Sequence, residues 1–213
     1  MNKNLTEMIL IVDRSGSMAG LEADTVGGIN ALLEKQRKQE GELLVTTVLF
    51  DDRTEWLYDR TPGSRVEPLT DRQYYVRGST ALLDAMAEVI NTISAGQRYA
   101  RSEDRPARTI VAITTDGMEN ASRRYRYAEI KEMVEARKKE GWEFLFLGAN
   151  IDAFGEAERI GIHRDCAVKS FADRAGTGAA FASINDAVSM MRRDVPLDGR
   201  WKKAVEEDAE TRK

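Results

Sequence analysis

Cysteine and histidine each occur only once in this chain of 213 residues, as Cys166 and His163. A single thiol cannot form a disulfide within the chain, and this scarcity fits a reducing compartment. We expect Cys166 to be a buried structural residue, because nothing near it in the sequence supplies the activating environment that a nucleophilic thiol needs. We expect His163 to be a loop residue rather than a metal ligand or a general base.

Long apolar segments are also absent from the sequence. The first apolar run, residues 8–12, is far too short to span a bilayer, and a charged residue follows it at once. The residues before this run show no basic start ahead of a long apolar stretch, so we expect no signal peptide and no membrane partner. We therefore expect a cytoplasmic protein.

Neither sign of charge dominates the chain. Its 32 Lys and Arg residues against 36 Asp and Glu residues give a formal net charge of −4. This balance argues against a nucleic-acid partner, and we interpret the two Arg-rich stretches, near residues 98–108 and 123–126, as solvated surface.

Hydrophobic residues make up 42% of the chain, which is enough for one α/β core. Short apolar runs predict strands at residues 8–12, 43–50, 110–115, 142–147 and 166–171. Apolar residues at helical spacing predict helices within residues 25–36, 82–93, 130–137, 153–160 and 181–191. Residues 54–60 follow a turn, which predicts an antiparallel strand at the sheet edge. This order predicts a doubly wound, mostly parallel sheet with one antiparallel edge strand and helices on both faces.

The composition of the chain changes near residue 194. Residues 1–193 carry the alternating pattern, so we expect a single domain there. Residues 194–213 form a charged C-terminal tail that contains Pro196 and Gly199. Trp201 could order part of this tail, but its many charges predict fraying.

The run of residues 8–12 is apolar on both faces and leads into Asp13, Ser15 and Ser17. Such a strand belongs in the middle of a covered parallel sheet, where ligands collect beyond the carboxyl ends of the strands. Side chains at alternate positions of an extended chain point the same way, so three oxygen atoms converge. Hard oxygen donors favour Mg²⁺ or Mn²⁺, with Ca²⁺ less favoured. The alternative is that Ser15 or Ser17 only caps the next helix.

Two later segments supply donors of the same kind. Thr80 lies in a Gly-containing loop just before a predicted helix, and Asp116 follows the apolar run of residues 110–115. Together with Asp13, Ser15 and Ser17, these residues make the chain resemble the von Willebrand factor A (VWA) domain family. That family carries a metal-ion-dependent adhesion site (MIDAS) made of an Asp-x-Ser-x-Ser loop, a Thr in a later loop and an Asp after a further strand. All five elements occur here in the family's order.

The resemblance extends over most of residues 5–170 and implies the Rossmann-like VWA fold of an intracellular, bacterial-type single-domain protein. The implied ligands of one Mg²⁺ or Mn²⁺ ion are Asp13, Ser15, Ser17, Thr80 and Asp116. In this family an Asp or Glu side chain of another protein completes the metal shell. The resemblance therefore implies a protein–protein interaction module rather than an enzyme.

Three further polar residues lie close to these motifs in the sequence. Glu119 and Asn120 follow Asp116 in the same loop, and the corresponding residues of the family usually support the site rather than bind the ion. Asp84 follows Thr80 by four positions. We expect Asp84 to cap its helix or to steady the loop.

The alternative function is that of a Mg-dependent phosphohydrolase of the haloacid-dehalogenase-like type, which also has an Asp at the end of its first strand. That family needs a second Asp two residues later as the general acid, and Ser15 stands there. A hydroxyl of ordinary acidity is a poor proton donor to a leaving group. A nucleotide-binding domain is disfavoured because no phosphate-binding glycine motif is present, and residues 176–178 predict only a flexible entry into the last helix.

Overall fold

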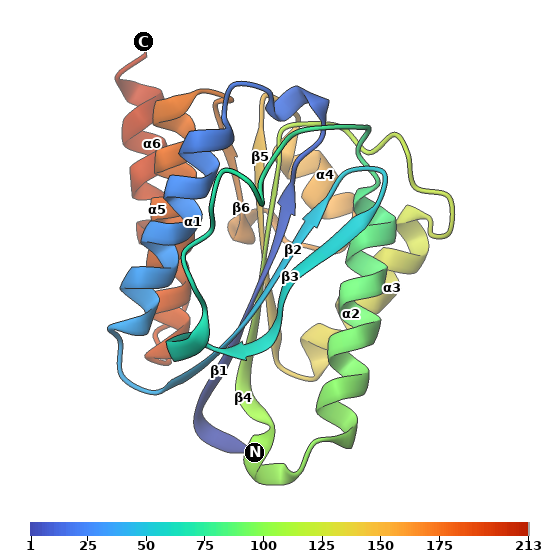
Figure 1. Ribbon diagram of the computed structural model, residues 1–213, viewed down its shortest axis with the longest axis vertical. Coiled ribbons are helices and arrows are strands. Elements are labelled where there is room, and N and C mark those ends of the chain that lie inside the picture. The colour runs from blue at the N-terminus through green and yellow to red at the C-terminus, as the bar shows by residue number, and fades with distance from the viewer. Residues whose placement is uncertain (213) are drawn as a thin grey trace.

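The computed structural model describes residues 1–212, which form a six-stranded sheet between two layers of helices (Figure 1). The strand order is β3-β2-β1-β4-β5-β6. The strands are β1 (Asn2–Asp13), β2 (Glu42–Phe50), β3 (Thr54–Pro62), β4 (Pro106–Thr115), β5 (Trp142–Ala149) and β6 (Ala167–Ser170). All neighbouring strands are parallel except β2 and β3, which are antiparallel. The predicted fold class is confirmed, including the antiparallel edge strand.

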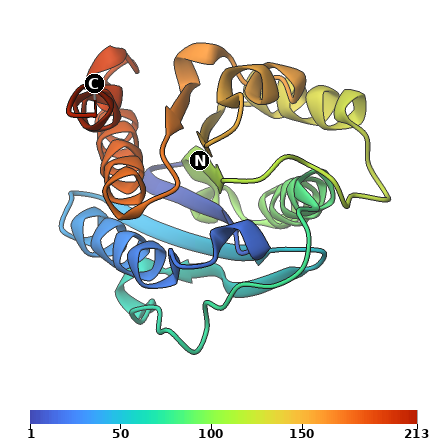
Figure 2. The same ribbon diagram turned by 90° about the horizontal axis from the view of Figure 1, so that it is seen from above.

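Helices cover both faces of the sheet, as the view from above shows (Figure 2). They are α1 (Glu22–Arg37), α2 (Leu82–Tyr99), α3 (Tyr127–Lys139), α4 (Ala153–Arg159), α5 (Arg174–Arg192) and α6 (Lys203–Glu210). Helices α1, α5 and α6 pack on one face, and α2, α3 and α4 pack on the other. No helix within residues 1–212 is long and apolar enough to cross a bilayer.

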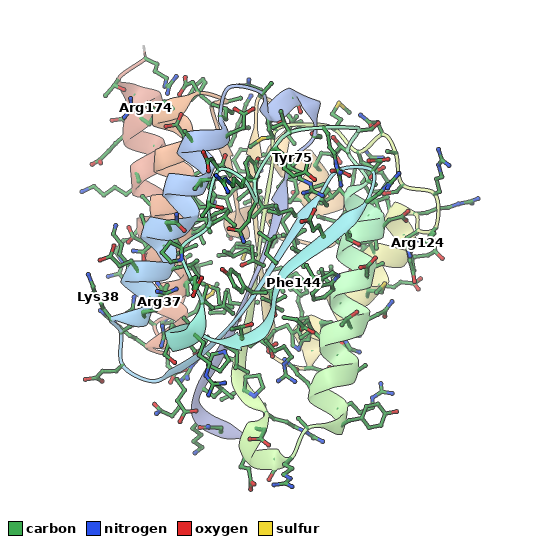
Figure 3. All side chains as sticks on the ribbon, viewed as in Figure 1. Arg37, Lys38, Tyr75, Arg124, Phe144 and Arg174 are labelled. Carbon is green, nitrogen blue, oxygen red and sulfur yellow. The ribbon has the colours of Figure 1, made fainter. Side chains whose placement is uncertain are left out.

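Strand β1 lies in the middle of the sheet and contributes to both cores. Met8, Leu10 and Val12 belong to the core under α1 and α5, whereas Ile9 and Ile11 belong to the core under α2 and α3. Alternate side chains of a strand point to opposite faces, so a strand covered on both sides needs an unbroken apolar run. Figure 3 shows that apolar and charged side chains lie in different places, with Phe144 of β5 in the interior and Lys38 and Arg174 on the outer surface.

The carboxyl ends of β1, β2 and β4 lie side by side at one edge of the sheet, at the top of Figure 1. Asp13 is the last residue of β1, Asp51 directly follows β2, and Asp116 directly follows β4. The parallel direction of the three strands therefore brings three carboxylates, far apart in the sequence, to the same edge.

The segment after α5 differs from the predicted fraying tail. Residues Gly199–Lys202 form a 3-10 helix that continues into α6, and α6 packs against α5. The side chain of Trp201 is fully buried in the core shared with α1 and α5. One large aromatic side chain anchors the segment, while its charges remain outside. The division of the chain at residue 193 stays a prediction.

The start of α5 also differs from the sequence-based expectation. Gly176 and Thr177, which we expected in a flexible entry, lie inside the helix and are buried. The backbone of Phe171 comes so near that a Cβ at Gly176 would meet its carbonyl oxygen at 2.2 Å. Glycine at this position thus permits close packing rather than flexibility.

We expect Trp201→Ala to lower the free energy of unfolding by about 3–5 kcal/mol, because it empties a large buried site. Denaturant unfolding followed by circular dichroism measures the change. Tyr99→Ala is the matched control, since Tyr99 is an aromatic residue that is 84% exposed. If Trp201→Ala lowers the free energy of unfolding no more than Tyr99→Ala does, residues 199–210 do not pack as described.

Candidate metal centre

Three loops meet at the sheet edge where β1 and β4 end. The first follows β1 and contains a 3-10 helix, Gly16–Met18. The second leads into α2 and contains Thr80, and the third follows β4 and begins with Asp116. The backbone of the first loop contacts the second directly, because the Gly16 N–H donates to the Gly78 carbonyl oxygen at 3.2 Å.

The carboxylate of Asp13 is fully buried, and protein donors engage both of its oxygens. Oδ1 accepts a hydrogen bond from the Ser15 N–H at 2.7 Å, and Oδ2 accepts one from the Thr115 hydroxyl at 2.5 Å. These bonds fix the orientation of the carboxylate beneath the loop. Because both oxygens of Asp13 already accept hydrogen bonds, the carboxylate would contact a bound ion through its remaining lone pairs or through a water molecule.

The two serine hydroxyls connect the first loop to Asp116. Ser15 Oγ lies 3.1 Å from Ser17 Oγ, and Ser17 Oγ donates to Asp116 Oδ1 at 2.5 Å. Ser15 occupies the position before the 3-10 helix but makes no side-chain capping bond. The structure therefore gives no support to the capping alternative for Ser15, and it points the Ser17 hydroxyl at the predicted site.

Gly117 marks the space that these hydroxyls surround. A Cβ atom placed on Gly117 would lie 2.8 Å from Thr80 Oγ1, 3.3 Å from Ser17 Oγ and 3.7 Å from Ser15 Oγ. Three hydroxyl oxygens from two loops thus face one small space beside the glycine. Asp116 is hydrogen-bonded to Ser17, and Asp13 is hydrogen-bonded to the Ser15 N–H, so the five residues predicted from the sequence lie at the same edge of the sheet.

The donor set suits a hard divalent cation. Within residues 1–212, no three side chains of His, Cys, Asp or Glu gather as a metal site. Two carboxylates and three hydroxyls at this edge could hold an ion, and oxygen donors of this kind suit Mg²⁺ and Mn²⁺ rather than copper.

Burial changes the acidity of both carboxylates. It raises the pKa of Asp13 to about 6, although the hydrogen bonds from Thr115 and Ser15 partly oppose this effect. Burial also raises the pKa of Asp116, against the hydrogen bond from Ser17. Low solvent access disfavours the charged form of a carboxyl group, and a nearby cation favours it.

The loop after Asp116 holds Thr80 in place. Asn120 Oδ1 accepts a hydrogen bond from the Thr80 N–H, and the Thr80 carbonyl oxygen accepts one from the Asn120 N–H, each at 3.0 Å. Glu119 accepts a hydrogen bond from the Leu83 N–H at 3.0 Å and three more from its own loop. The expected supporting roles of Asn120 and Glu119 agree with these contacts.

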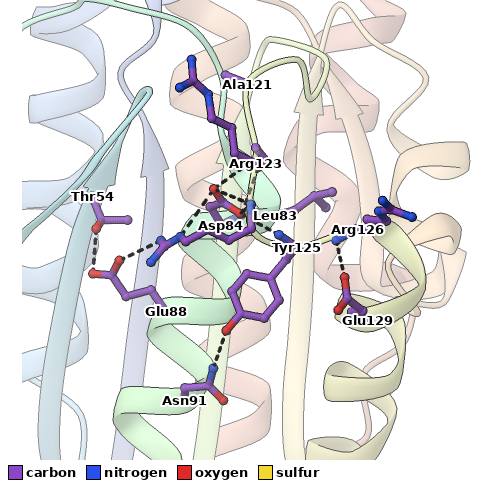
Figure 4. Close-up of polar contacts among 12 residues, drawn as sticks. Thr54, Leu83, Asp84, Glu88, Asn91, Ala121, Arg123, Tyr125, Arg126 and Glu129 are labelled. Atoms are coloured by element: carbon purple, nitrogen blue, oxygen red, sulfur yellow. Dashed lines mark hydrogen bonds and ion pairs between the residues drawn. The ribbon is translucent and has the colours of Figure 1, made fainter.

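Asp84 fastens the same loop to the start of α2 (Figure 4). Its carboxylate accepts hydrogen bonds from the backbone N–H groups of Arg123, Arg124 and Tyr125, each with a shortest distance of 3.0 Å. The Arg124 guanidinium also pairs with Glu88, one turn further along α2. Asp84 therefore steadies the loop after Asp116, whereas from the sequence we expected it to cap its helix or to steady the Thr80 loop.

Sequence reasoning missed a buried ionic cluster beside the site. Asp51 Oδ2 accepts hydrogen bonds from Arg14 Nε at 2.9 Å and Arg77 Nε at 2.7 Å, so one carboxylate joins the first two loops. Burial alone would raise the pKa of Asp51, but the hydrogen bond from Arg77 and the charge of Arg14 help to hold it below its usual value. Asp51 follows an apolar strand just as Asp13 and Asp116 do, and this position is the sequence signal that could have revealed it.

The lone cysteine and histidine lie away from this edge. Cys166 is half-buried rather than fully buried, and burial raises the pKa of its thiol, which keeps the reactive thiolate scarce at neutral pH. His163 lies in a loop, as expected, where its Nδ1 accepts a hydrogen bond from the Asp165 N–H at 3.3 Å.

Comparison with known proteins agrees with this architecture. A family model described as "VWA domain containing CoxE-like protein" matches residues 2–142, which is well over half of the chain. The chain belongs to this family. No curated protein matches the sequence of this VWA protein.

Solved structures of low sequence identity share the fold. The vWF domain of the type V pili tip protein Mfa5 from Porphyromonas gingivalis has a TM-score of 0.65 at 10% identity, covering 87% of this chain and 95% of that one. Manganese-loaded TRAP protein from Plasmodium vivax has a TM-score of 0.56 at 17% identity, with 84% and 73% covered. A structure of proximal thread matrix protein 1 from the mussel byssus, with a zinc-occupied MIDAS motif, has a TM-score of 0.55 at 16% identity. There the match covers 91% of this chain and 46% of the other, so the chain spans about half the length of the mussel protein.

We expect Gly117→Ala to weaken Mn²⁺ binding at least about tenfold while the domain stays folded, because the new methyl group would occupy the space between the three hydroxyls. Titration followed by electron paramagnetic resonance of free Mn²⁺ measures the affinity. Gly27→Ala in α1 is the matched control, since nothing lies within 4 Å of the Cβ it would add. Equal Mn²⁺ affinity in the two variants would show that no ion binds beside Gly117.

Proposed function

We propose that this VWA domain is a metal-dependent protein–protein interaction module that binds an acidic side chain of a partner protein. The observation that carries the proposal is the convergence of the Ser15, Ser17 and Thr80 hydroxyls beside Gly117. The carboxylate of Asp116 is hydrogen-bonded to Ser17 Oγ, and that of Asp13 to the Ser15 N–H. The proposed partner is another protein in the cytoplasm, with no role for nucleic acid or membrane.

Mg²⁺ or Mn²⁺ is the proposed ion. Short hydroxyl ligands suit a small octahedral ion that keeps some of its water, whereas Ca²⁺ usually takes more oxygen ligands, often from bidentate carboxylates. Two of the similar structures contain manganese and zinc, respectively, so this fold accommodates more than one divalent metal.

The incoming ligand is proposed to be a carboxylate because the protein's own anionic ligands are few and already engaged. Thr115 and the Ser15 N–H occupy both oxygens of Asp13, and Ser17 donates to Asp116. Hydroxyl ligands are neutral, so an ion held in this way keeps much of its charge. An anionic oxygen from a partner then gains more from the ion than a neutral one does.

Binding is favoured over the phosphohydrolase alternative by the chemistry at residue 15. Ser15 Oγ lies 3.1 Å from Ser17 Oγ, at the position where that mechanism needs an acid to protonate the leaving group. The half-buried thiol of Cys166 and the lone His163 lie in other parts of the fold.

We expect Asp13→Ala and Thr80→Ala each to weaken Mn²⁺ or Mg²⁺ binding by about 10- to 100-fold, since each removes an oxygen that orients or holds the ion. Isothermal titration calorimetry with each metal salt measures the effect. Asp59→Ala, which removes an exposed acid of β3, serves as the control. If all three variants bind metal as the unchanged protein does, the ion lies elsewhere.

We also expect no hydrolysis of generic phosphomonoesters or nucleotides above background in Mg²⁺ or Mn²⁺. The physical reason is the absence of a suitable proton donor at Ser15. Metal-dependent turnover that disappears in Asp13→Asn would favour the phosphohydrolase over the interaction module.

A further inference from the structure

A small cavity of about 30 Å³ lies beside Asp116, between α1, α5 and the ends of β4, β5 and β6. Its apolar walls include Met18, Leu147, Phe171 and Ala180. Asp116 itself lines the cavity, so the cavity and the proposed metal centre share this residue. Phe171 is 36% exposed, which extends one wall to the surface of the molecule.

The dimensions of the cavity suit a small aliphatic group. A space of about 10–15 Å³ on this measure holds one water molecule, so the observed space holds a group of roughly two heavy atoms. The wall on the side of Phe171 is firm, because the Arg212 guanidinium stacks over that ring at 4.2 Å and pairs with Asp173 and Asp208. An apolar space of this kind gains free energy when an apolar side chain replaces its water.

The unpaired charges on the loop after Asp116 are positive. Asp84 and Glu119 are occupied by backbone N–H groups, and Glu88 is paired with Arg124. The side chains of Arg123 and Arg126 are exposed, and neither forms an ion pair within the described residues. The same loop exposes Met118. Aromatic residues, Met and Arg are enriched at protein interfaces, and the charge favours an acidic partner.

From these observations we propose that the cavity beside Asp116 is a specificity pocket for a small aliphatic side chain, such as Ala or Val, adjacent to the partner's metal-binding acid. This inference rests on the proposed function, because the acid must bind at the metal for its neighbour to reach the cavity. The occupant is thus a partner segment in which an Asp or Glu stands next to a small apolar residue. The loop arginines add attraction for further acids in that segment.

The test uses synthetic peptides with one central Asp and a single varied neighbour, either Gly, Ala, Val, Ser or Lys. Binding is measured by fluorescence polarisation in Mn²⁺ and in a chelator. We expect the Ala peptide to bind about fourfold and the Val peptide at least about tenfold more tightly than the Gly peptide, and only in Mn²⁺, since Ala adds one buried carbon atom and Val adds three.

Filling the cavity from the protein side gives the decisive comparison. Ala180→Leu places a larger side chain in the cavity and should abolish the preference for Ala and Val while leaving Mn²⁺ affinity unchanged. Ala149→Val tests the same space from the end of β5 if Ala180→Leu fails to fold. Ala128→Leu, on the exposed side of α3, is the matched control and should keep the preference.

The outcomes separate this inference from the proposed function. Asp peptides that bind in Mn²⁺ without any preference for the neighbour, or with a preference that Ala180→Leu leaves intact, overturn the pocket alone. Mn²⁺ binding without Mn²⁺-dependent peptide binding overturns the acidic partner and the pocket together. Failure to bind Mn²⁺ at all overturns the metal-dependent function and, with it, the pocket.

Discussion

The central position of strand β1, buried on both faces, is the constraint on which the site depends. Its apolar side chains enter two different cores, so β1 cannot move to the sheet edge without exposing one set of them. Strands β2 and β4 lie on either side of β1 and run parallel to it, so the carboxyl ends of the three strands are adjacent. The loop residues after these strands are then neighbours in space, although more than 100 residues separate Asp13 from Asp116.

The ionic cluster around Asp51 holds the first two loops at a fixed distance from each other. Arg14 is fully buried between Asp13 and Ser15, and a buried guanidinium without a carboxylate would destabilise the protein by about 3–5 kcal/mol. Asp51 meets this requirement and binds Arg77 of the Thr80 loop through the same oxygen. Its carbonyl oxygen also accepts the Ala81 N–H at 2.8 Å. The charge of Arg14 is therefore neutralised by Asp51 and also by Glu55, whose carboxylate lies 2.7 Å from the Arg14 guanidinium.

Hydrogen bonds within the protein hold the loops of the proposed metal centre in place before an ion binds. Asn120 and Glu119 hold the start of α2 from one side, and Asp84 holds the loop from the other. Few side chains need to be ordered when an ion arrives, so little conformational entropy is lost on binding. The apolar cavity beside Asp116 has one firm wall for a different reason, because the Arg212 guanidinium stacks over the ring of Phe171.

The sequence alone determined the fold class and the five candidate ligands. Both follow from local properties, namely the spacing of hydrophobic residues along the chain and the polar residues that follow apolar strands. The sequence also predicted a structural role for Asp84, but only the tertiary structure showed that Asp84 holds the loop after Asp116. Only the tertiary structure assigned Asp51 a function, because its partners come from two other loops and no local pattern records them. It likewise ordered residues 199–210 through the burial of Trp201 in the core, a tertiary contact that outweighs a charged local composition.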